Sequence, residues 1–297
     1  MIKTERKVRK TLMNDIIKNI GDKSEALSKS HKKIAEYILA KCEKAAYMTA
    51  GRLSESVGVS ESTVVRFAYE MGFDGYPEFQ KALKEYVKGH LTTAQRMELA
   101  YEKMASGDVL TSTLKADIGY IEKTLDTIDQ EQFSRAADAI SQAGKIYITG
   151  VRSAKGLADF LKFYLQLIFD NVYMINSTGG DLFEQILNVG KNDVVIGISF
   201  PRYSKNTLKA LSYAKNGGAT VIGITDRENS PVAIESDICL ISRSDTASFV
   251  DSLVAPLSVI NALIAAVGIK NREKMQKNLE KLEQIWEEYE VYDKNDG

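Results

Sequence analysis

The spacing of hydrophobic and polar positions changes about halfway along the chain. Up to residue 85 the hydrophobic residues follow a helical period only, as in Ile34, Tyr37 and Ile38 behind a candidate N-cap at Ser28 or Ser30. From residue 145 onwards, short β-rich runs alternate with helical stretches. This alternation predicts βαβ units and a doubly wound parallel sheet that is covered by helices on both faces. The five predicted strands are 145–149, 172–175, 194–199, 219–225 and 238–241.

Two further helical stretches flank these regions. Residues 87–128 are polar and helix-prone, and they predict a helical connector with two apolar faces. The tail at 271–289 is highly charged but carries one apolar stripe, which predicts an amphipathic helix that needs a partner surface. The connector faces are Met97, Tyr101 and Met104, and Leu114, Ile118, Ile121 and Leu125; the tail stripe is Met275, Leu279, Leu282, Ile285 and Trp286.

Composition limits the class of protein. Of the 297 residues, 44% are hydrophobic and 27% are charged, which is typical of a globular chain and excludes disordered and fibrous classes. Cys42 and Cys239 are far apart and form no C-x-x-C pair, so we expect neither a disulfide framework nor a metal site. No apolar run approaches the roughly 18 residues of a membrane span, and the first residues lack the apolar core of a secretory signal. We therefore expect a cytoplasmic protein that does not bind membranes.

Charge is distributed unevenly along the chain. The net charge is −1, yet residues 1–90 carry +5 and the remainder carries −6. A basic segment on an acidic body is typical of a nucleic-acid-binding unit joined to another domain. A solvated helical surface gives the same pattern, so charge alone leaves both interpretations open.

Residues 49–73 have the pattern of a helix-turn-helix. Thr49 is placed to cap a first helix, Gly58 to end it in a left-handed conformation, and Ser60 to cap a second helix. The second helix, at 60–71, has a predicted buried face of Val64, Phe67, Ala68 and Met71. A plain helical hairpin is the alternative, but the spacing favours a unit that binds double-stranded DNA.

The other face of that second helix carries the candidate DNA-binding residues. Serine and threonine hydroxyls reach phosphates and base edges in the major groove, and arginine is the most common reader of guanine. These residues are Ser60, Glu61, Ser62, Thr63, Arg66 and Tyr69.

Two turns that follow predicted strands carry serines and arginines. In a doubly wound sheet, ligands bind at the carboxyl ends of the strands, where helix N-termini attract anions. The turns are 150–154 and 199–204, and a third turn at 177–181 has a similar composition that also suits helix capping. The candidate ligand-binding residues are Arg152, Ser153, Ser199, Arg202 and Ser204.

Neither turn is a Walker A loop or a dinucleotide-binding fingerprint, so we expect no nucleotide and no cofactor. The serines of these turns suit a phosphate, because their hydroxyls donate hydrogen bonds, and the arginines suit bidentate pairing with it. The alternative is that the serines only cap helices and the arginines are surface charges.

With these motifs the chain resembles the RpiR/MurR family of bacterial transcription regulators over nearly its whole length. The run VSESTVVRFAYEMGFDGYPEFQ is similar to that family's helix-turn-helix, and residues from about 130 to 270 resemble a sugar isomerase (SIS) domain. The family's first turn usually reads G-x-G-S-S, where this chain has Arg152 and Ala154 in place of the second Gly and second Ser. Its second turn usually reads S-x-S-G-x-T, where Pro201 and Arg202 replace the central Ser-Gly.

The resemblance implies an all-α helix-turn-helix domain at 1–86, a connector at 87–128 and an α/β domain of SIS fold at 129–297. It implies an operator-binding regulator controlled by a phosphorylated sugar or sugar acid, with Ser153, Ser199 and Ser204 at the ligand. The two arginines favour a more anionic or differently shaped phosphorylated ligand; internal pairing of the arginines is the alternative.

An aldose–ketose phosphate isomerase, or a related SIS enzyme with an extra helical domain, is the alternative function. Such chemistry needs a general acid or base near the sugar C1 and C2. Both histidines, His31 and His90, precede the predicted sheet, and nothing in the sequence pairs Asp181, Glu184 or Asp251 with a second catalytic group. We therefore expect no enzymatic activity.

Helix-turn-helix proteins normally bind paired half-sites, so the sequence also predicts a homodimer or a dimer of dimers on a palindromic operator. The tail stripe and a long apolar helix at 249–267 are the candidate surfaces. The alternative for the tail is that its stripe packs back on its own domain.

Overall fold

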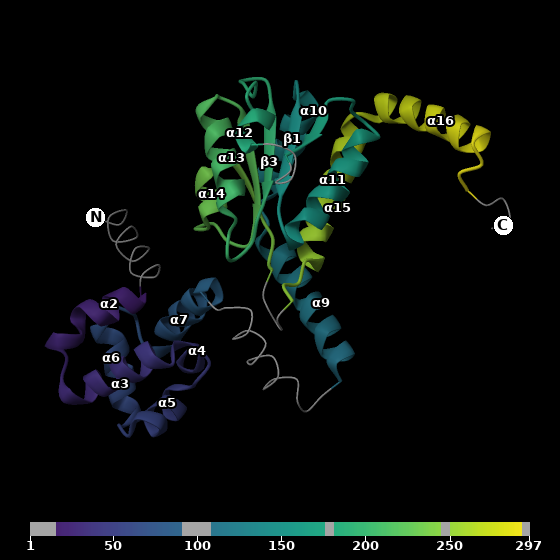
Figure 1. The fold of residues 1–297 in the computed structure, drawn as a ribbon. Helices are drawn as coiled ribbons and strands as arrows, with labels where there is room; N and C mark the ends of the chain where they lie inside the picture. The colour runs from purple at the N-terminus through teal and green to yellow at the C-terminus, as the bar shows by residue number, and fades with distance from the viewer. Residues whose placement is uncertain (1–15, 91–107, 176–180, 245–249, 293–297) are drawn as a thin grey trace. The chain divides into compact units, whose positions relative to one another are not determined.

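The computed structural model describes residues 16–90, 108–175, 181–244 and 250–292, and the chain divides into two compact units, 1–98 and 99–297 (Figure 1). The predicted three-part division stays a prediction, since the residues assigned to the connector fall on both sides of this boundary. The predicted face of Met97, Tyr101 and Met104 lies outside the described residues.

The described part of the first unit is helical, as predicted. Its core is mainly aliphatic and contains an aromatic cluster: the rings of Phe67 and Phe79 meet edge to face at 5.6 Å, and Phe73 meets Phe79 at 5.4 Å. The Tyr76 hydroxyl donates to the Met48 carbonyl (2.8 Å), which joins the last helix to the middle of the unit. The elements are α2 (Ile16–Lys23), the 3-10 helix η1 (Ser24–Ala26), α3 (Lys29–Ala40), α4 (Cys42–Ala45), α5 (Ala50–Val57), α6 (Glu61–Glu70) and α7 (Tyr76–His90).

The second unit is built on a parallel five-stranded sheet in the order β2-β1-β3-β4-β5. Each predicted strand is present, with ends within one residue of the prediction. The central strands are buried on both faces, which explains their continuous apolar runs. The strands are β1 (Ile146–Gly150), β2 (Val172–Met174), β3 (Val194–Ile198), β4 (Thr220–Thr225) and β5 (Ile238–Ile241).

Helices cover both faces of this sheet, so the predicted doubly wound architecture is confirmed (Figure 1). One face packs against α10 (Gln130–Gln142), α11 (Ser153–Gln166) and α15 (Val254–Lys270). The other packs against α12 (Leu182–Gln185), α13 (Lys205–Asn216) and α14 (Pro231–Glu235). The helix predicted at 249–267 corresponds to α15. Within the described residues it begins at Val254, and it ends three residues beyond the predicted end.

Two more helices complete the second unit. Helix α9 (Val109–Thr127) is fixed by a hydrogen bond from the Arg243 amide to Thr124 Oγ1 (2.9 Å) and one from Ser252 Oγ to Asp117 (2.6 Å). Helix α16 (Arg272–Glu288) leaves α15 at a bend of 99°. None of its side chains is buried, and Asn278 in its first half donates to the carbonyl of Leu167, the residue that follows α11 (3.1 Å).

Among the described helices, none has by itself the length and apolar composition of a membrane span. The bent pair formed by α15 and α16 meets those two criteria jointly.

Candidate functional site

The helix-turn-helix is formed by α5 and α6 through the three local signals predicted from the sequence. Thr49 Oγ1 accepts from the Arg52 amide (3.2 Å) and begins α5. Gly58 ends it with φ 71° and ψ 47°, a left-handed conformation that glycine adopts at little cost. Ser60 Oγ then accepts from the Thr63 amide (3.2 Å) and begins α6.

Helix α6 has the two faces that the sequence predicts. Val64, Phe67, Ala68 and Met71 are all fully buried against the other helices of the unit. The six candidate DNA-binding residues lie on the other side: Thr63 is half-buried, while Ser60, Glu61, Ser62, Arg66 and Tyr69 are exposed.

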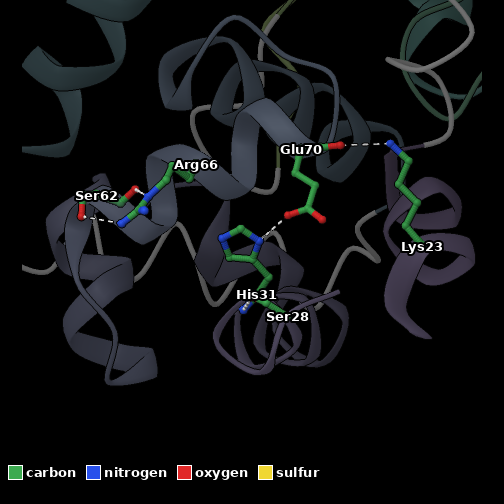
Figure 2. A network of polar contacts seen from close by, with 6 residues as sticks. All are labelled: Lys23, Ser28, His31, Ser62, Arg66 and Glu70. Atoms are coloured by element: carbon green, nitrogen blue, oxygen red, sulfur yellow. Dashed lines mark hydrogen bonds and ion pairs between the residues drawn. The ribbon is translucent and has the colours of Figure 1, made fainter. Parts of the chain in front are cut away.

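The exposed N-terminal end of α6 is rich in hydroxyl groups that contact one another. Ser60 Oγ lies 2.9 Å from Ser62 Oγ and 2.7 Å from Thr63 Oγ1. Arg66 reaches back along its own helix, where Nε donates to the Ser62 carbonyl (3.2 Å) and Nη2 to Ser62 Oγ (3.4 Å; Figure 2). Hydroxyls and a guanidinium therefore share one exposed end of the helix, and both kinds of group can contact base edges in a major groove.

The C-terminal end of α6 is held by residues of the preceding helices. Figure 2 shows these contacts at Glu70, apart from the contact between Arg66 and Ser62. The Glu70 carboxylate pairs with His31 Nδ1 of α3, and Lys23 Nζ donates to the Glu70 carbonyl (3.0 Å). The His31 ring also meets the Phe67 ring at 5.6 Å. One of the two histidines therefore supports the helical unit, which the sequence did not reveal.

The second unit has a cavity of about 630 Å³ where strands β1 and β3 end. The turns predicted at 150–154 and 199–204 both line it, although they are about 50 residues apart in the chain. All five candidate ligand-binding residues lie on its wall: Arg152, Ser153, Ser199, Arg202 and Ser204. Lys205 and Asp251 also line it, so its wall includes three cationic side chains and one carboxylate.

The first turn presents an uncapped helix N-terminus to this cavity. Ser153 is the first residue of α11, and the preceding Arg152 makes no side-chain cap. The first amides of a helix have no carbonyl partner within it, so they suit an anion. Gly150 sets the close approach of helix and strand, because a Cβ there would lie 2.7 Å from the Ala154 carbonyl oxygen.

The second turn uses its serines structurally. Ser199 Oγ accepts from the Ser204 amide (3.1 Å), and Ser204 Oγ accepts from the Thr207 amide (3.3 Å) as the N-cap of α13. The capping interpretation thus applies to Ser204, whereas Ser199 holds the turn together. Both serines still line the cavity and keep a hydroxyl proton to donate.

Both arginines of the cavity have positive φ, 56° at Arg152 and 64° at Arg202. At these two positions the turns of the RpiR/MurR family usually have glycine. The backbone conformation explains this preference, because glycine adopts a positive φ at little cost. Non-glycine residues at such φ cost about 1–3 kcal/mol and concentrate at functional sites.

A polar cluster beside the second turn was not found from the sequence. The Tyr203 hydroxyl donates to Asp226 Oδ1 (2.7 Å) across 23 residues, and Arg227 Nε lies 3.7 Å from Asp226 Oδ2. The Arg227 guanidinium stands 5.8 Å from the centre of the Tyr203 ring. Burial and the adjacent Asp226 raise the pKa of Tyr203 well above its usual range, so the phenol remains a donor. The cluster ties the turn to the end of β4.

The carboxylates considered for an isomerase are separated by the fold. Asp251 lines the cavity, whereas Asp181 caps the short helix α12 and Glu184 is exposed on it. The turn at 177–181 lies outside the described residues except for Asp181. No group of His, Cys, Asp and Glu suited to a metal ion occurs in the part of the chain that the structure describes.

Together, α5 and α6 and the serine-lined cavity at the carboxyl edge of a parallel sheet define a helix-turn-helix protein with an α/β domain. Residues 13–89 match the helix-turn-helix domain of the rpiR family, and residues 139–266 match the SIS domain. The chain belongs to the RpiR family and is a helix-turn-helix transcriptional regulator with a SIS domain.

The chain is similar to several individual proteins. HexR, a helix-turn-helix transcriptional regulator of Escherichia coli, is 26% identical over 285 residues, which cover 92% of this chain and 95% of HexR. The sugar isomerase domain of an RpiR transcription factor from Sphaerobacter thermophilus matches with a TM-score of 0.58 at 24% identity, covering 60% of this chain and 99% of that one. NanR of Vibrio vulnificus, solved in complex with ManNAc-6P, matches with a TM-score of 0.56 at 19% identity, covering 91% and 97%.

Proposed function

We propose that a phosphorylated sugar or sugar acid binds in the cavity at the ends of β1 and β3 and controls the affinity of α6 for operator DNA. The single observation that carries this proposal is the meeting of both serine–arginine turns in one cavity of about 630 Å³. Its cationic side chains, uncapped helix N-terminus and serine hydroxyls are complementary to a phosphate group. NanR, of the same fold, was solved in complex with ManNAc-6P.

The residues take the following roles in the proposal. The α11 N-terminus, Ser153 and Ser204 donate hydrogen bonds to the phosphate, and Ser199 holds the second turn against it. Arg152 and Arg202 supply charge at positions where glycine offers none, and charge-assisted bonds are roughly twice as strong as neutral ones. Ser60, Glu61, Ser62, Thr63, Arg66 and Tyr69 contact the operator.

The regulator acts in the cytoplasm, where operators and phosphorylated sugars occur together, and as a homodimer or dimer of dimers. Binding alone does not regulate, because an effector shifts only an equilibrium whose two states it binds unequally. The effector therefore favours one arrangement of the paired SIS domains, and this preference is passed to the DNA-binding units.

The experiment is a thermal-shift screen of phosphorylated sugars, amino sugars and sugar acids, followed by operator binding with each hit. An effector present at about 100 times its dissociation constant adds roughly 2.7 kcal/mol to the free energy of unfolding. A hit that stabilises the protein and changes operator affinity supports the proposal. Stabilisation by none of the phosphorylated compounds, at millimolar concentration, contradicts it.

The isomerase alternative has one observation in its favour, which is that the Asp251 carboxylate lines the cavity. A carboxylate can act as the base of an aldose–ketose isomerisation when it is placed near the sugar C1 and C2. Incubation with fructose 6-phosphate or arabinose 5-phosphate tests it directly. Turnover that is lost in Asp251→Asn establishes the enzyme; no turnover with either sugar leaves the regulator as the function of the cavity.

A further inference from the structure

Helix α9 exposes a stripe of large apolar side chains. Leu110 and Leu125 are 68% and 70% exposed, Leu114 and Ile118 are 53% and 55%, and Ile121 is 38%. At 100° per residue, these five positions lie within about 80° of the helix circumference, so they form one continuous seam. A contiguous apolar seam of this size on a soluble protein marks an interaction surface.

The seam continues into a groove on the same unit. Ile121 and Leu125 line a cavity of about 240 Å³ together with Ala255, Val259 and Ala262 of α15. Helix α15 is apolar almost all round its circumference, and helices of that kind are normally covered on every side. Its exposed Ala262 thus belongs to a face that the described residues of this unit leave uncovered.

The spacing of the five apolar residues along α9 indicates which partner covers the seam. The intervals between its five residues are four, four, three and four, and the set is almost unchanged when the helix direction is reversed about Ile118. Two copies of α9 in antiparallel contact therefore place Leu110 opposite Leu125 and Leu114 opposite Ile121, with Ile118 at the two-fold axis. An isologous interface requires this self-complementarity.

The charges beside the seam obey the same symmetry. Lys115 and Glu122 are exposed on one flank of α9. In an antiparallel pair, each flank faces the same flank of the other copy, so Lys115 lies near Glu122 of the second copy, and the two-fold axis makes this contact twice. Opposite charges that meet across a helix pair favour one orientation over the other.

We propose that α9 is the dimerisation helix of this protein. It pairs antiparallel with α9 of a second copy and packs into the groove between α9 and α15 of that copy. This interface rests on the homodimer of the proposed function and names the surface that forms it, while it does not depend on the effector. It also replaces the α16 stripe as the main surface through which two copies associate.

Sedimentation of the full-length protein, without DNA or effector, tests the proposal. The wild type is expected to sediment as a dimer at micromolar concentration. Leu114→Glu/Ile121→Glu brings four carboxylates together in the paired seam and is expected to give a monomer with an unchanged circular dichroism spectrum. Leu187→Glu, the same change at a 67% exposed leucine elsewhere in the unit, is the matched control and remains dimeric. A monomeric wild type, or a double variant that is as dimeric as the control, overturns the proposal.

Charge reversal tests the antiparallel orientation without placing a charge in the apolar seam. Lys115→Glu and Glu122→Lys each raise the dimer dissociation constant, and the double variant Lys115→Glu/Glu122→Lys restores it. If the double variant is weaker than either single variant, the helices do not pair antiparallel. Ile285→Glu on α16 completes the set: dissociation by this variant alone assigns the interface to α16 and overturns the proposal.

Discussion

At the scale of single residues, the arginines of the cavity combine a charge with an unfavourable backbone conformation. Arg152 has φ 56° and ψ −127°, a region that glycine enters far more readily than any residue with a Cβ. The sequence shows which residues stand in the turns, but φ depends on how strand β1 joins α11. The strain became evident only in the structure.

We expect Arg152→Gly to raise the free energy of unfolding by about 1 kcal/mol, since it relieves this strain. The same variant should weaken phosphate binding, because the charge is lost. Urea denaturation and a titration with inorganic phosphate measure the two effects. Arg152→Ala is the control, since it removes the charge but keeps the Cβ. Equal stability of the Gly and Ala variants would show that the backbone is unstrained.

Arg66 belongs to the same scale. Arg66→Ala is expected to weaken specific operator binding by about 1–3 kcal/mol if its guanidinium pairs with a guanine. Fluorescence anisotropy on the promoter upstream of the protein's own operon, at a stated salt concentration, measures this. Arg52→Ala, an exposed arginine on α5, is the matched control. Unchanged affinity and unchanged sequence preference in Arg66→Ala exclude it as a base reader.

At the scale of elements, the cluster of Tyr203, Asp226 and Arg227 connects the second turn to β4. Tyr203→Phe removes one donor from a nearly buried carboxylate, which costs about 1–3 kcal/mol of stability. Because the folded pKa of Tyr203 is raised, its contribution is complete below the usual tyrosine pKa of about 10 and is lost as pH rises beyond it.

We therefore expect Tyr203→Phe to be less stable than wild type at pH 7 and to bind phosphate more weakly, because the turn is less firmly held. Its disadvantage in stability should shrink above about pH 10. Urea denaturation at both pH values measures this. Tyr213→Phe is the control, since its hydroxyl donates to the Leu187 carbonyl at a long 3.5 Å. Equal phosphate affinity in both variants would refute a positioning role for Tyr203.

Sequence reasoning succeeded where structure is decided locally. The caps at Thr49, Gly58 and Ser60 follow from short-range rules, and the strands follow from apolar runs bounded by turns. It placed the two turns at one edge of the sheet because parallel strands end together. It did not find the bond between Tyr203 and Asp226, because nothing local links residues 23 positions apart. Periodicity also showed that Leu114 and Leu125 share a face, but not that this face is exposed.

At the scale of the whole molecule, the proposed function requires that the cavity and α6 influence each other. A coupling free energy of about 1–3 kcal/mol changes operator affinity about 5- to 150-fold. Ser199→Ala and Arg202→Ala should leave operator affinity near wild type without effector and reduce the change that the effector causes. Operator binding with and without the hit from the ligand screen measures the response.

Ser230→Ala is the matched control for this experiment. Ser230 caps α14, accepting from the Ala233 amide (3.0 Å), so its variant loses a helix cap without touching the lining of the cavity. It should respond to effector like the parent. If Ser199→Ala and Arg202→Ala also respond like the parent, the effector binds elsewhere and the two turns serve only to begin helices.

Helix α15 runs from the proposed effector cavity to the proposed dimer interface. Asp251, on the wall of the cavity, lies three residues before its first turn, and Ala262 in the α9 groove lies further along the same rod, which is about 25 Å long. A packed helix moves as a rigid body, so a shift at one end reaches the other. The coupling is reciprocal. An effector that tilts α15 changes the dissociation constant of the dimer, and dilution of the protein into monomers changes the apparent affinity for the effector. Under the two proposals together, the dose at which the protein responds in a cell depends on how many copies of it the cell makes.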